Sequence, residues 1–182
     1  MKVLSVNVGL PRLVEYRGKP VATGIFKEPV GGRVPVGEFN LEGDAQADLS
    51  VHGGYSKAVY VYPSEHYEFW GNELPEMSLP FGIFGENLTT EGLLETDANV
   101  GDRFRIGTAK FIVTQPRQPC FKLVIRFGRS DIIKKFAKSG RSGFYLAIEK
   151  TGELGAGDEI KFVSRASNQP SIHEVVRERF NL

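Results

Sequence analysis

Short runs of alternating or β-branched residues recur along the chain and are separated by turns. Twenty-one glycines and ten prolines in 182 residues mark those turns. Many short strands with frequent turn signals are typical of a β-sandwich or a β-barrel. The pattern predicts strands at Lys2–Val8, Val36–Leu41, Ala58–Tyr62, Arg103–Ile106, Lys110–Thr114, Phe144–Glu149 and Glu159–Ser164.

Two of these strands are preceded by the same kind of turn. Residues Gly101–Ile106 and Gly157–Phe162 both run from a Gly-Asp pair into alternating polar and apolar positions. Two copies are too few for a solenoid, so we interpret the similarity as recurring barrel geometry.

Helical periodicity is confined to short segments. The signals are one-sided apolar spacing, N-capping residues before a segment and glycine after it. They predict helices at Ser64–Leu74, at Asp131–Lys138 with Ser130 as N-cap and Gly140 beyond the end, and at about residues 171–181, where Ser171 and Glu174 form a capping-box pattern. The expected fold is therefore mainly β, a β-barrel with a few short peripheral helices.

Length and charge narrow the classes of function. A chain of 182 residues fits a single domain, 1–182. The net charge of +1 gives no field to recruit nucleic acid or an anionic membrane.

No window approaches ~20 consecutive apolar residues, and the N-terminus reads as a strand, not a signal peptide. One cysteine fits a reducing compartment, so a cytoplasmic protein is expected. A homodimer is the default assembly.

Three segments are too polar and glycine-rich to be simple strands. They are Gly43–Gly54, Phe81–Asn87 and Gln115–Lys122. Because functional groups concentrate on loops that a rigid scaffold holds, these segments are the places to search for a site.

The single cysteine lies in the third of these segments. Pro119 suits the first position of a helix, which would place Cys120 in the first turn beside unpaired backbone N–H groups. Arg117 and Lys122 flank it. This environment favours the thiolate, which is both a nucleophile and a soft-metal ligand. The alternative is a small buried core residue.

The first segment combines acidic residues with a histidine. His52 could shuttle protons near neutral pH if Asp44 or Asp48 orients it. Gly53 and Gly54 would let the backbone approach a ligand closely. The alternative is a solvated acidic loop. No two histidines have the spacing of a zinc site.

Further candidate ligand contacts lie elsewhere. Glu86 and Asn87 could orient a ligand or satisfy a turn. Arg141, between two glycines, could bind a phosphate, although Gly140 is equally explained as a helix cap. Lys27 is a further candidate for contact with an anion.

Taken in order, these segments resemble the MOSC domain, named for the C-terminal domain of molybdenum-cofactor sulfurase, and in particular its stand-alone bacterial YiiM-like branch. The similarity covers about residues 20 to 165. The stretches that carry it are Thr23–Val30, Leu41–Gly54, Tyr62–Tyr67, Phe84–Leu88, Val100–Asp102, Gln115–Leu123 and Gly140–Tyr145.

The resemblance implies a molybdenum cofactor (molybdopterin) whose metal, or whose sulfur, is held by Cys120. It maps acid/base and orienting roles onto Asp44 and His52. Its basic cofactor-binding positions map onto Lys27, Arg117 and Arg141. The implied activity is reduction of N-hydroxylated or N-oxide small molecules such as 6-hydroxylaminopurine. The sequence shows no flavin or iron–sulfur signature, so a separate redox partner is expected.

Two other functions use the same residues. A non-catalytic cofactor carrier or sulfur-relay protein would use Cys120 to hold a persulfide or to hand the cofactor to another enzyme, and it would need only an exposed docking face. A cysteine hydrolase would pair Cys120 with His52 and Asp44. YiiM-type relatives continue into a further helical region, whereas this chain ends after one predicted helix, so activities that need that region are in doubt.

Overall fold

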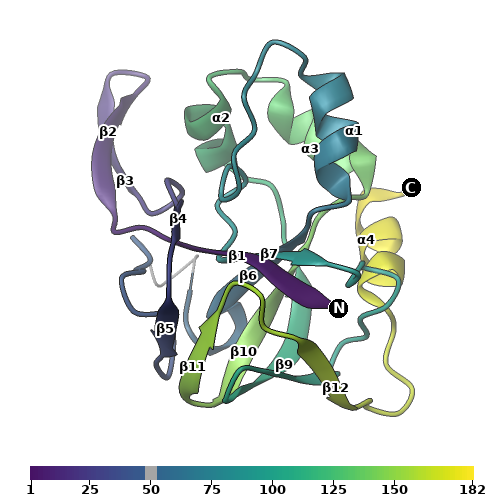
Figure 1. The fold of residues 1–182 in the computed structure, drawn as a ribbon. Helices are drawn as coiled ribbons and strands as arrows, with labels where there is room; N and C mark the ends of the chain where they lie inside the picture. The colour runs from purple at the N-terminus through teal and green to yellow at the C-terminus, as the bar shows by residue number, and fades with distance from the viewer. Residues whose placement is uncertain (48–52) are drawn as a thin grey trace.

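The main element of the fold is one large, mostly antiparallel sheet. The computed structural model describes residues 1–47 and 53–182. Within them eight strands form a sheet in the order β12-β8-β9-β10-β6-β7-β1-β4, and only β6 and β7 pair in parallel (Figure 1). The strands are β1 (Lys2–Val8), β4 (Glu28–Val30), β6 (Val59–Pro63), β7 (Leu88–Glu91), β8 (Arg103–Ile106), β9 (Ala109–Pro116), β10 (Phe144–Lys150) and β12 (Ile160–Ser164).

The β12 end of this sheet approaches β1, the second strand from the other end. Val3 donates from its backbone N–H to the carbonyl of Asp158 (2.9 Å), and Ile160 donates to Met1 (3.0 Å). Beyond these contacts and an isolated bridge from Lys2 to Glu159, no ladder joins the two ends within the described residues. The mainly β class is confirmed, but the closed barrel is not.

Side-chain alternation gives the sheet its buried face. Along β9, Ala109, Phe111 and Val113 point into the core, and the intervening residues are more exposed. They pack with Leu146 and Phe104 in a continuous apolar cluster. Each fully buried phenylalanine or leucine contributes roughly 1.5–3 kcal/mol of transfer free energy, so this cluster fixes the register of the sheet.

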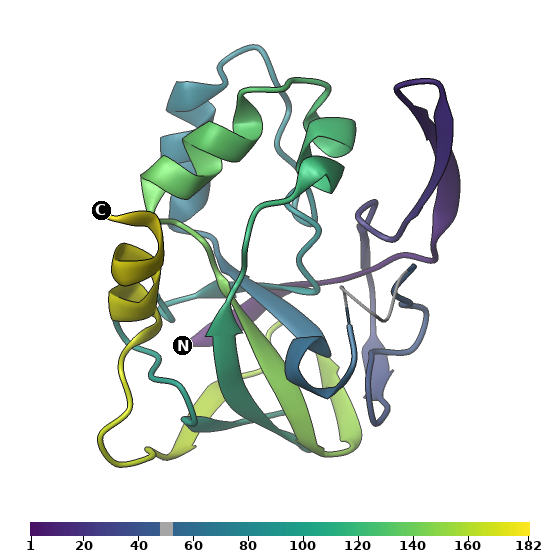
Figure 2. The same cartoon turned by 180° about the vertical axis from the view of Figure 1, so that it is seen from behind.

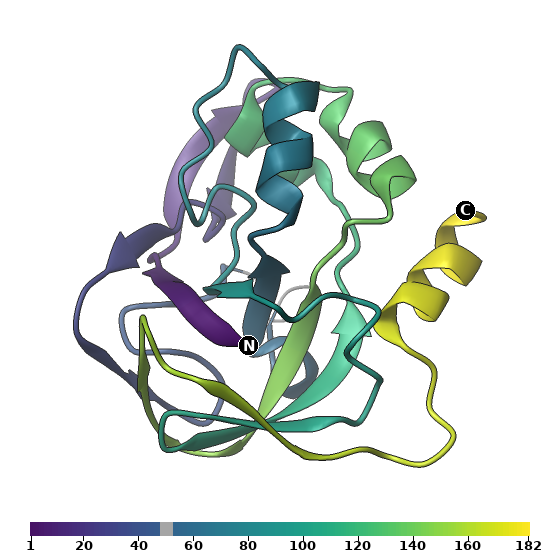
Figure 3. The same cartoon turned by 45° about the vertical axis from the view of Figure 1, so that its right-hand side comes forward.

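A second, aromatic core joins a helical layer to one end of the sheet. Figure 2 and Figure 3 show α1 (His66–Glu73), α2 (Phe121–Phe127) and α3 (Ile132–Ser139) grouped there, with α4 (Ile172–Phe180) set apart. The rings of Trp70 and Phe136 stack at 5.9 Å, and those of Tyr62 and Phe84 at 4.4 Å. Trp70 donates its indole N–H to the Tyr62 hydroxyl at 2.6 Å, which satisfies that buried polar group.

The predicted helices are present with shifted starts. The first begins at His66, and α3 begins at Ile132 after Asp131 as N-cap, so Ser130 is not the cap. Gly140 ends α3 in the left-handed conformation, as predicted (φ 66°). The helix predicted to begin at Pro119 begins two residues later, at Phe121. Cys120 is therefore the N-cap of α2, with extended backbone (φ −137°, ψ 171°), and not a first-turn residue.

Several strands were missed or misplaced by the sequence pattern. The prediction of a strand at Val36–Leu41 is wrong: β5 spans Arg33–Val36 and pairs with β11 (Gly152–Gly155). Val36 and Leu41 instead face each other across a turn. The hairpin of β2 (Arg12–Tyr16) and β3 (Lys19–Thr23), the purple ribbon at the upper left of Figure 1, was also missed. A short 3₁₀ turn, η1, spans Tyr55–Lys57.

The two similar Gly-Asp strands are neighbours in the sheet. β8 and β12 pair antiparallel, with Phe104 opposite Phe162 and their ring centroids 5.8 Å apart. Their similarity therefore reflects two adjacent strands that share one pair of faces. No described helix is long and apolar enough to cross a membrane.

The capping box of α4 gives a direct stability prediction. Ser171 Oγ accepts from the Glu174 backbone N–H (3.1 Å), and Glu174 accepts from the Ser171 N–H (2.7 Å). Ser171→Ala should lower the free energy of unfolding by about 1 kcal/mol, measured by urea titration. Ser130→Ala is the matched control, because α3 has no side-chain cap. Equal losses in the two variants would contradict the assignment.

Candidate functional site

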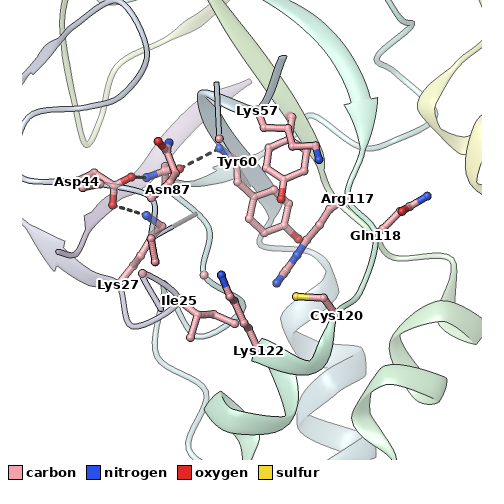
Figure 4. A pocket seen from close by; sticks show the side chains of 17 residues that line it. Ile25, Lys27, Asp44, Lys57, Tyr60, Asn87, Arg117, Gln118, Cys120 and Lys122 are labelled. Atoms are coloured by element: carbon pink, nitrogen blue, oxygen red, sulfur yellow. Dashed lines mark hydrogen bonds and ion pairs between the residues drawn. The ribbon is translucent and has the colours of Figure 1, made fainter. Parts of the chain in front are cut away.

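All three polar loops singled out in the sequence meet at one pocket. Asp44 and Gly53 come from the first loop, Asn87 from the second, and Arg117 and Cys120 from the third. The segment between β3 and β4 closes one side, and α2 closes the other (Figure 4). Loops that are distant in sequence meet because β1, β6, β7, β9 and β10 are close in the same sheet.

Cys120 occupies the rim of this pocket. Its side chain is partly exposed, and Figure 4 shows the sulfur directed into the pocket beside Arg117. A fully buried core cysteine is therefore not what the structure shows. Among the described residues no group of three or more His, Cys, Asp or Glu side chains could hold a metal ion. Cys120 is the one sulfur-bearing side chain in the described lining of the pocket.

Arg117 is a buried cation at the base of the pocket. It lies just beyond β9 and is 6% exposed. Its guanidinium donates to the carbonyl oxygen of Phe84 and lies 4.7 Å from the centre of the Tyr60 ring. Burial would lower the pKa of Arg117, but Tyr60, Tyr145 and Cys120 outweigh this and raise it. The guanidinium therefore stays charged.

Opposite Cys120, a buried ion pair holds a second cation. Lys27 Nζ contacts Asp44 Oδ1, and both side chains are almost fully buried. Asp44 also accepts from the Gly9 N–H (3.0 Å) and from Asn87 Nδ2 (2.9 Å). Asn87 in turn accepts from the Tyr60 backbone N–H at 3.0 Å (Figure 4). Burial lowers the pKa of Lys27, and the ion pair with Asp44 opposes that shift.

These contacts give Asp44 structural partners, and its acid/base or orienting role beside His52 stays a prediction. The sequence presented it as an acid/base or orienting group for His52. In the structure its two oxygens are directed at Lys27, Gly9 and Asn87. Asp44 therefore positions Lys27. His52 and Asp48 lie outside the described residues.

Glu86 lies beneath the pocket and does not line it. This fully buried carboxylate accepts hydrogen bonds from the Tyr67 hydroxyl, the backbone N–H groups of Gly82 (2.7 Å) and Phe84 (3.1 Å), and the Thr89 hydroxyl (3.0 Å). Burial raises the pKa of Glu86. These hydrogen bonds fix the loop that carries Asn87 and the Phe84 carbonyl. Glu86 therefore supports the lining of the pocket from behind.

Two other predicted contacts are also placed elsewhere. The Arg141 guanidinium lies 3.9 Å from the centre of the Phe69 ring and donates to the Ser139 carbonyl (3.0 Å), so it is not part of the pocket lining. Gly54 precedes η1 and does not line the pocket. Gly53 does, and its φ of 101° is a backbone conformation that residues other than glycine rarely adopt.

Sequence reasoning missed two tyrosines and one lysine that line the pocket. Tyr60 on β6 and Tyr145 on β10 pair across the sheet, with ring centroids 5.2 Å apart. Burial raises the pKa of both. Their signal was an aromatic residue with a polar tip within each predicted strand. Lys57 and Lys122 also line the pocket. Lys122 had been noted only as a neighbour of Cys120.

The balance of charge in the lining favours an anion. Among the described lining residues, Lys27, Lys57, Arg117 and Lys122 are cationic, and only Asp44 carries a carboxylate. Because partly buried cations attract anions more strongly than solvated ones, the described lining favours an anionic ligand over a cationic one.

Sequence comparison gives relatives across most of the chain. The family model described as MOSC domain matches residues 48–161. YflK of Bacillus subtilis, an uncharacterized protein, is 44% identical over 170 residues, which cover 93% of this chain and 76% of YflK. YiiM of Escherichia coli is 42% identical over 90% of this chain and 73% of its own length. A protein named reductase from Gibberella moniliformis is 34% identical over 88% of this chain, which covers 29% of that longer protein.

Structural comparison agrees. The crystal structure of YiiM from Geobacillus stearothermophilus superposes with a TM-score of 0.82 at 33% identity, covering 98% of this chain and 83% of that one. The family match includes Cys120, Arg117 and Asn87 of the pocket, and it begins after Lys27 and Asp44. This chain belongs to the MOSC domain family and is a YiiM-like member of it.

Proposed function

We propose that this protein binds the molybdenum cofactor through Cys120 and reduces N-hydroxylated or N-oxide compounds, of which 6-hydroxylaminopurine is the type. One observation carries the proposal: the single cysteine of the chain faces a pocket whose lining is dominated by cations. MOSC domains are associated with this cofactor as a family.

The residues of the pocket fit the cofactor chemically. A molybdopterin dithiolene supplies two soft sulfur atoms, and the Cys120 thiolate would add a third. The cofactor also carries a phosphate, for which Arg117 and Lys27 are the buried cationic partners. Arg141, which the sequence placed in this role, is excluded from the proposed set because it packs on Phe69.

The bound cofactor would supply the exchange of two electrons with the substrate. An N-hydroxylated amine takes up two electrons and two protons, its N–O bond breaks, and an amine and water are released. His52 would deliver a proton to the departing oxygen. Tyr60 holds its hydroxyl toward the Ser142 carbonyl (2.7 Å), so it donates there and supports the wall of the pocket.

The source of electrons is a separate redox protein. A single cysteine cannot build an iron–sulfur cluster, and the sequence has no flavin motif. A relative named reductase, of whose length this chain covers 29%, supports a reductive role.

The test is metal content followed by turnover. The protein should be purified without oxygen from cells that make the cofactor and from cells that do not, and its molybdenum per chain measured by mass spectrometry. The loaded protein should reduce 6-hydroxylaminopurine with reduced methyl viologen as donor. Molybdenum without reduction would favour the carrier. Absence of molybdenum from both preparations would overturn the proposal.

His52→Ala separates cofactor binding from proton delivery. Because general acid catalysis contributes roughly 10²–10⁴ in rate, turnover should fall by about that factor while molybdenum content stays at the parent level. His173→Ala on α4 is the control, because His173 does not line the pocket. Normal turnover in His52→Ala would show that His52 is not the proton donor.

A further inference from the structure

Two arginines flank one phenylalanine ring beside the pocket. The Arg12 guanidinium carbon lies 3.5 Å from the centre of the Phe26 ring, and that of Arg126 lies 5.1 Å from it. Arg12 belongs to the β2–β3 hairpin and Arg126 to α2. Phe26 lies between Ile25 and Lys27, which both line the pocket. Neither arginine is part of the lining itself.

Neither of these guanidiniums has a carboxylate within ion-pair distance in the part of the chain that the structure describes. The arginines at 33, 103, 129 and 165 all do. Arg126 makes one long hydrogen bond, to the Ile83 carbonyl (3.4 Å). Burial and then the neighbouring Arg12 lower the pKa of Arg126, and the carboxylates of Glu86 and Glu28 offset only part of this shift. A bound anion would relieve the repulsion between the two guanidiniums.

The arginine pair continues the cationic lining outward. Arg126 follows Lys122 by four residues on α2, so the two side chains share a face of the helix about 6 Å apart along its axis. Lys122 lines the pocket next to Cys120. The hairpin is held against the same helix by Tyr16, whose ring stacks on Phe121 at 5.5 Å. A row of cations therefore leads from Cys120 to Arg12.

We infer that Arg12 and Arg126 form a subsite for the phosphate of a nucleotide, whose base enters the Cys120 pocket. The inference rests on the proposed function and adds a substrate class: the phosphorylated form of an N-hydroxylated base, not the free base. A guanidinium stacked on an aromatic ring keeps its N–H edge available, and that planar edge matches phosphate oxygens. A free base has no group that uses this charge.

The experiment measures binding without turnover. Adenosine 5′-monophosphate and adenosine serve as unreactive probes, titrated calorimetrically into the cofactor-free protein at low and moderate salt. Arg12→Gln and Arg126→Gln are compared with Arg17→Gln, which makes the same change of charge on the same hairpin, where Arg17 packs on Tyr16 instead of Phe26. Thermal unfolding of each variant checks that it is folded.

The nucleotide should bind at least about tenfold more tightly than the nucleoside, since each charge-assisted contact is worth a factor of that order. Arg12→Gln and Arg126→Gln should each lose most of that advantage, and Arg17→Gln should keep it. Equal binding of nucleotide and nucleoside, or an equal loss in Arg17→Gln, would overturn the subsite.

A second arm identifies the source of the phosphate. If the subsite serves the substrate, Arg126→Gln keeps its molybdenum content. If molybdenum falls with Arg126→Gln and the nucleotide has no advantage, the phosphate belongs to the cofactor and the substrate assignment is overturned. Because the titration uses cofactor-free protein, absence of molybdenum from the parent protein would defeat the proposed function without deciding the subsite.

Discussion

Replacing Cys120 by serine is expected to remove molybdenum from the protein without unfolding it. Cys120 is the N-cap of α2, and its side chain makes no capping hydrogen bond, so the helix does not depend on the thiol. Serine is a good N-cap residue, which should preserve or slightly improve the local structure. A hydroxyl is a far poorer ligand for a soft metal than a thiolate.

The expected loss is at least about tenfold in molybdenum per chain, since even contacts beyond the direct ligands change metal affinity by 10–100-fold. Gln118→Ala is the matched control, because Gln118 lines the same pocket and carries no soft ligand. The absence of other cysteines allows a second measurement: a thiol reagent should label cofactor-free protein and spare the loaded form. Full molybdenum content in Cys120→Ser would contradict the assignment of Cys120 as a metal ligand.

Asp44→Ala is expected to have the largest effect on stability. Its removal leaves the buried ammonium of Lys27 without its counter-charge, and leaves Gly9 N–H and Asn87 Nδ2 without an acceptor for these hydrogen bonds. Breaking one side of a buried ion pair typically costs about 3–5 kcal/mol. Domains of this size have total stabilities of about 5–15 kcal/mol, so the loss should be obvious in urea unfolding.

Two variants make that result specific. Glu91→Ala breaks the exposed Lys2–Glu91 pair and should cost less than about 1 kcal/mol. Lys27→Met together with Asp44→Asn removes both charges and should be less destabilising than Asp44→Ala alone, since no uncompensated charge remains buried. A loss in Asp44→Ala no greater than that in Glu91→Ala would show that the ion pair does not support the pocket.

The buried network also explains how the scaffold holds the pocket rigid. Asn87 connects Asp44 to the backbone of β6, and Glu86 fixes the loop that bears the carbonyl partner of Arg117. Arg117 and Lys27, the two cations proposed to bind the cofactor phosphate, therefore both depend on the segment between Gly82 and Asn87. Substitutions in that loop should affect ligand binding even where no ligand atom is touched.

The sequence alone determined those features that depend on local patterns. Alternation located β8 with its observed bounds, because a half-buried strand needs a period of two, and a valine-rich run located β1. The capping box located α4, because both hydrogen bonds join residues three positions apart. The polar, glycine-rich loops marked the pocket, because segments without regular structure must carry groups that are satisfied elsewhere.

The tertiary structure decided which side chains meet. Arg117 and Arg141 look alike in sequence, yet one packs against Tyr60 at the pocket and the other on Phe69 outside it. The Arg12–Phe26–Arg126 cluster joins a hairpin to a helix more than a hundred residues away. Such contacts follow from long-range strand pairing and from the direction in which each backbone presents its side chain. No local pattern records either of these, so only the folded chain shows them.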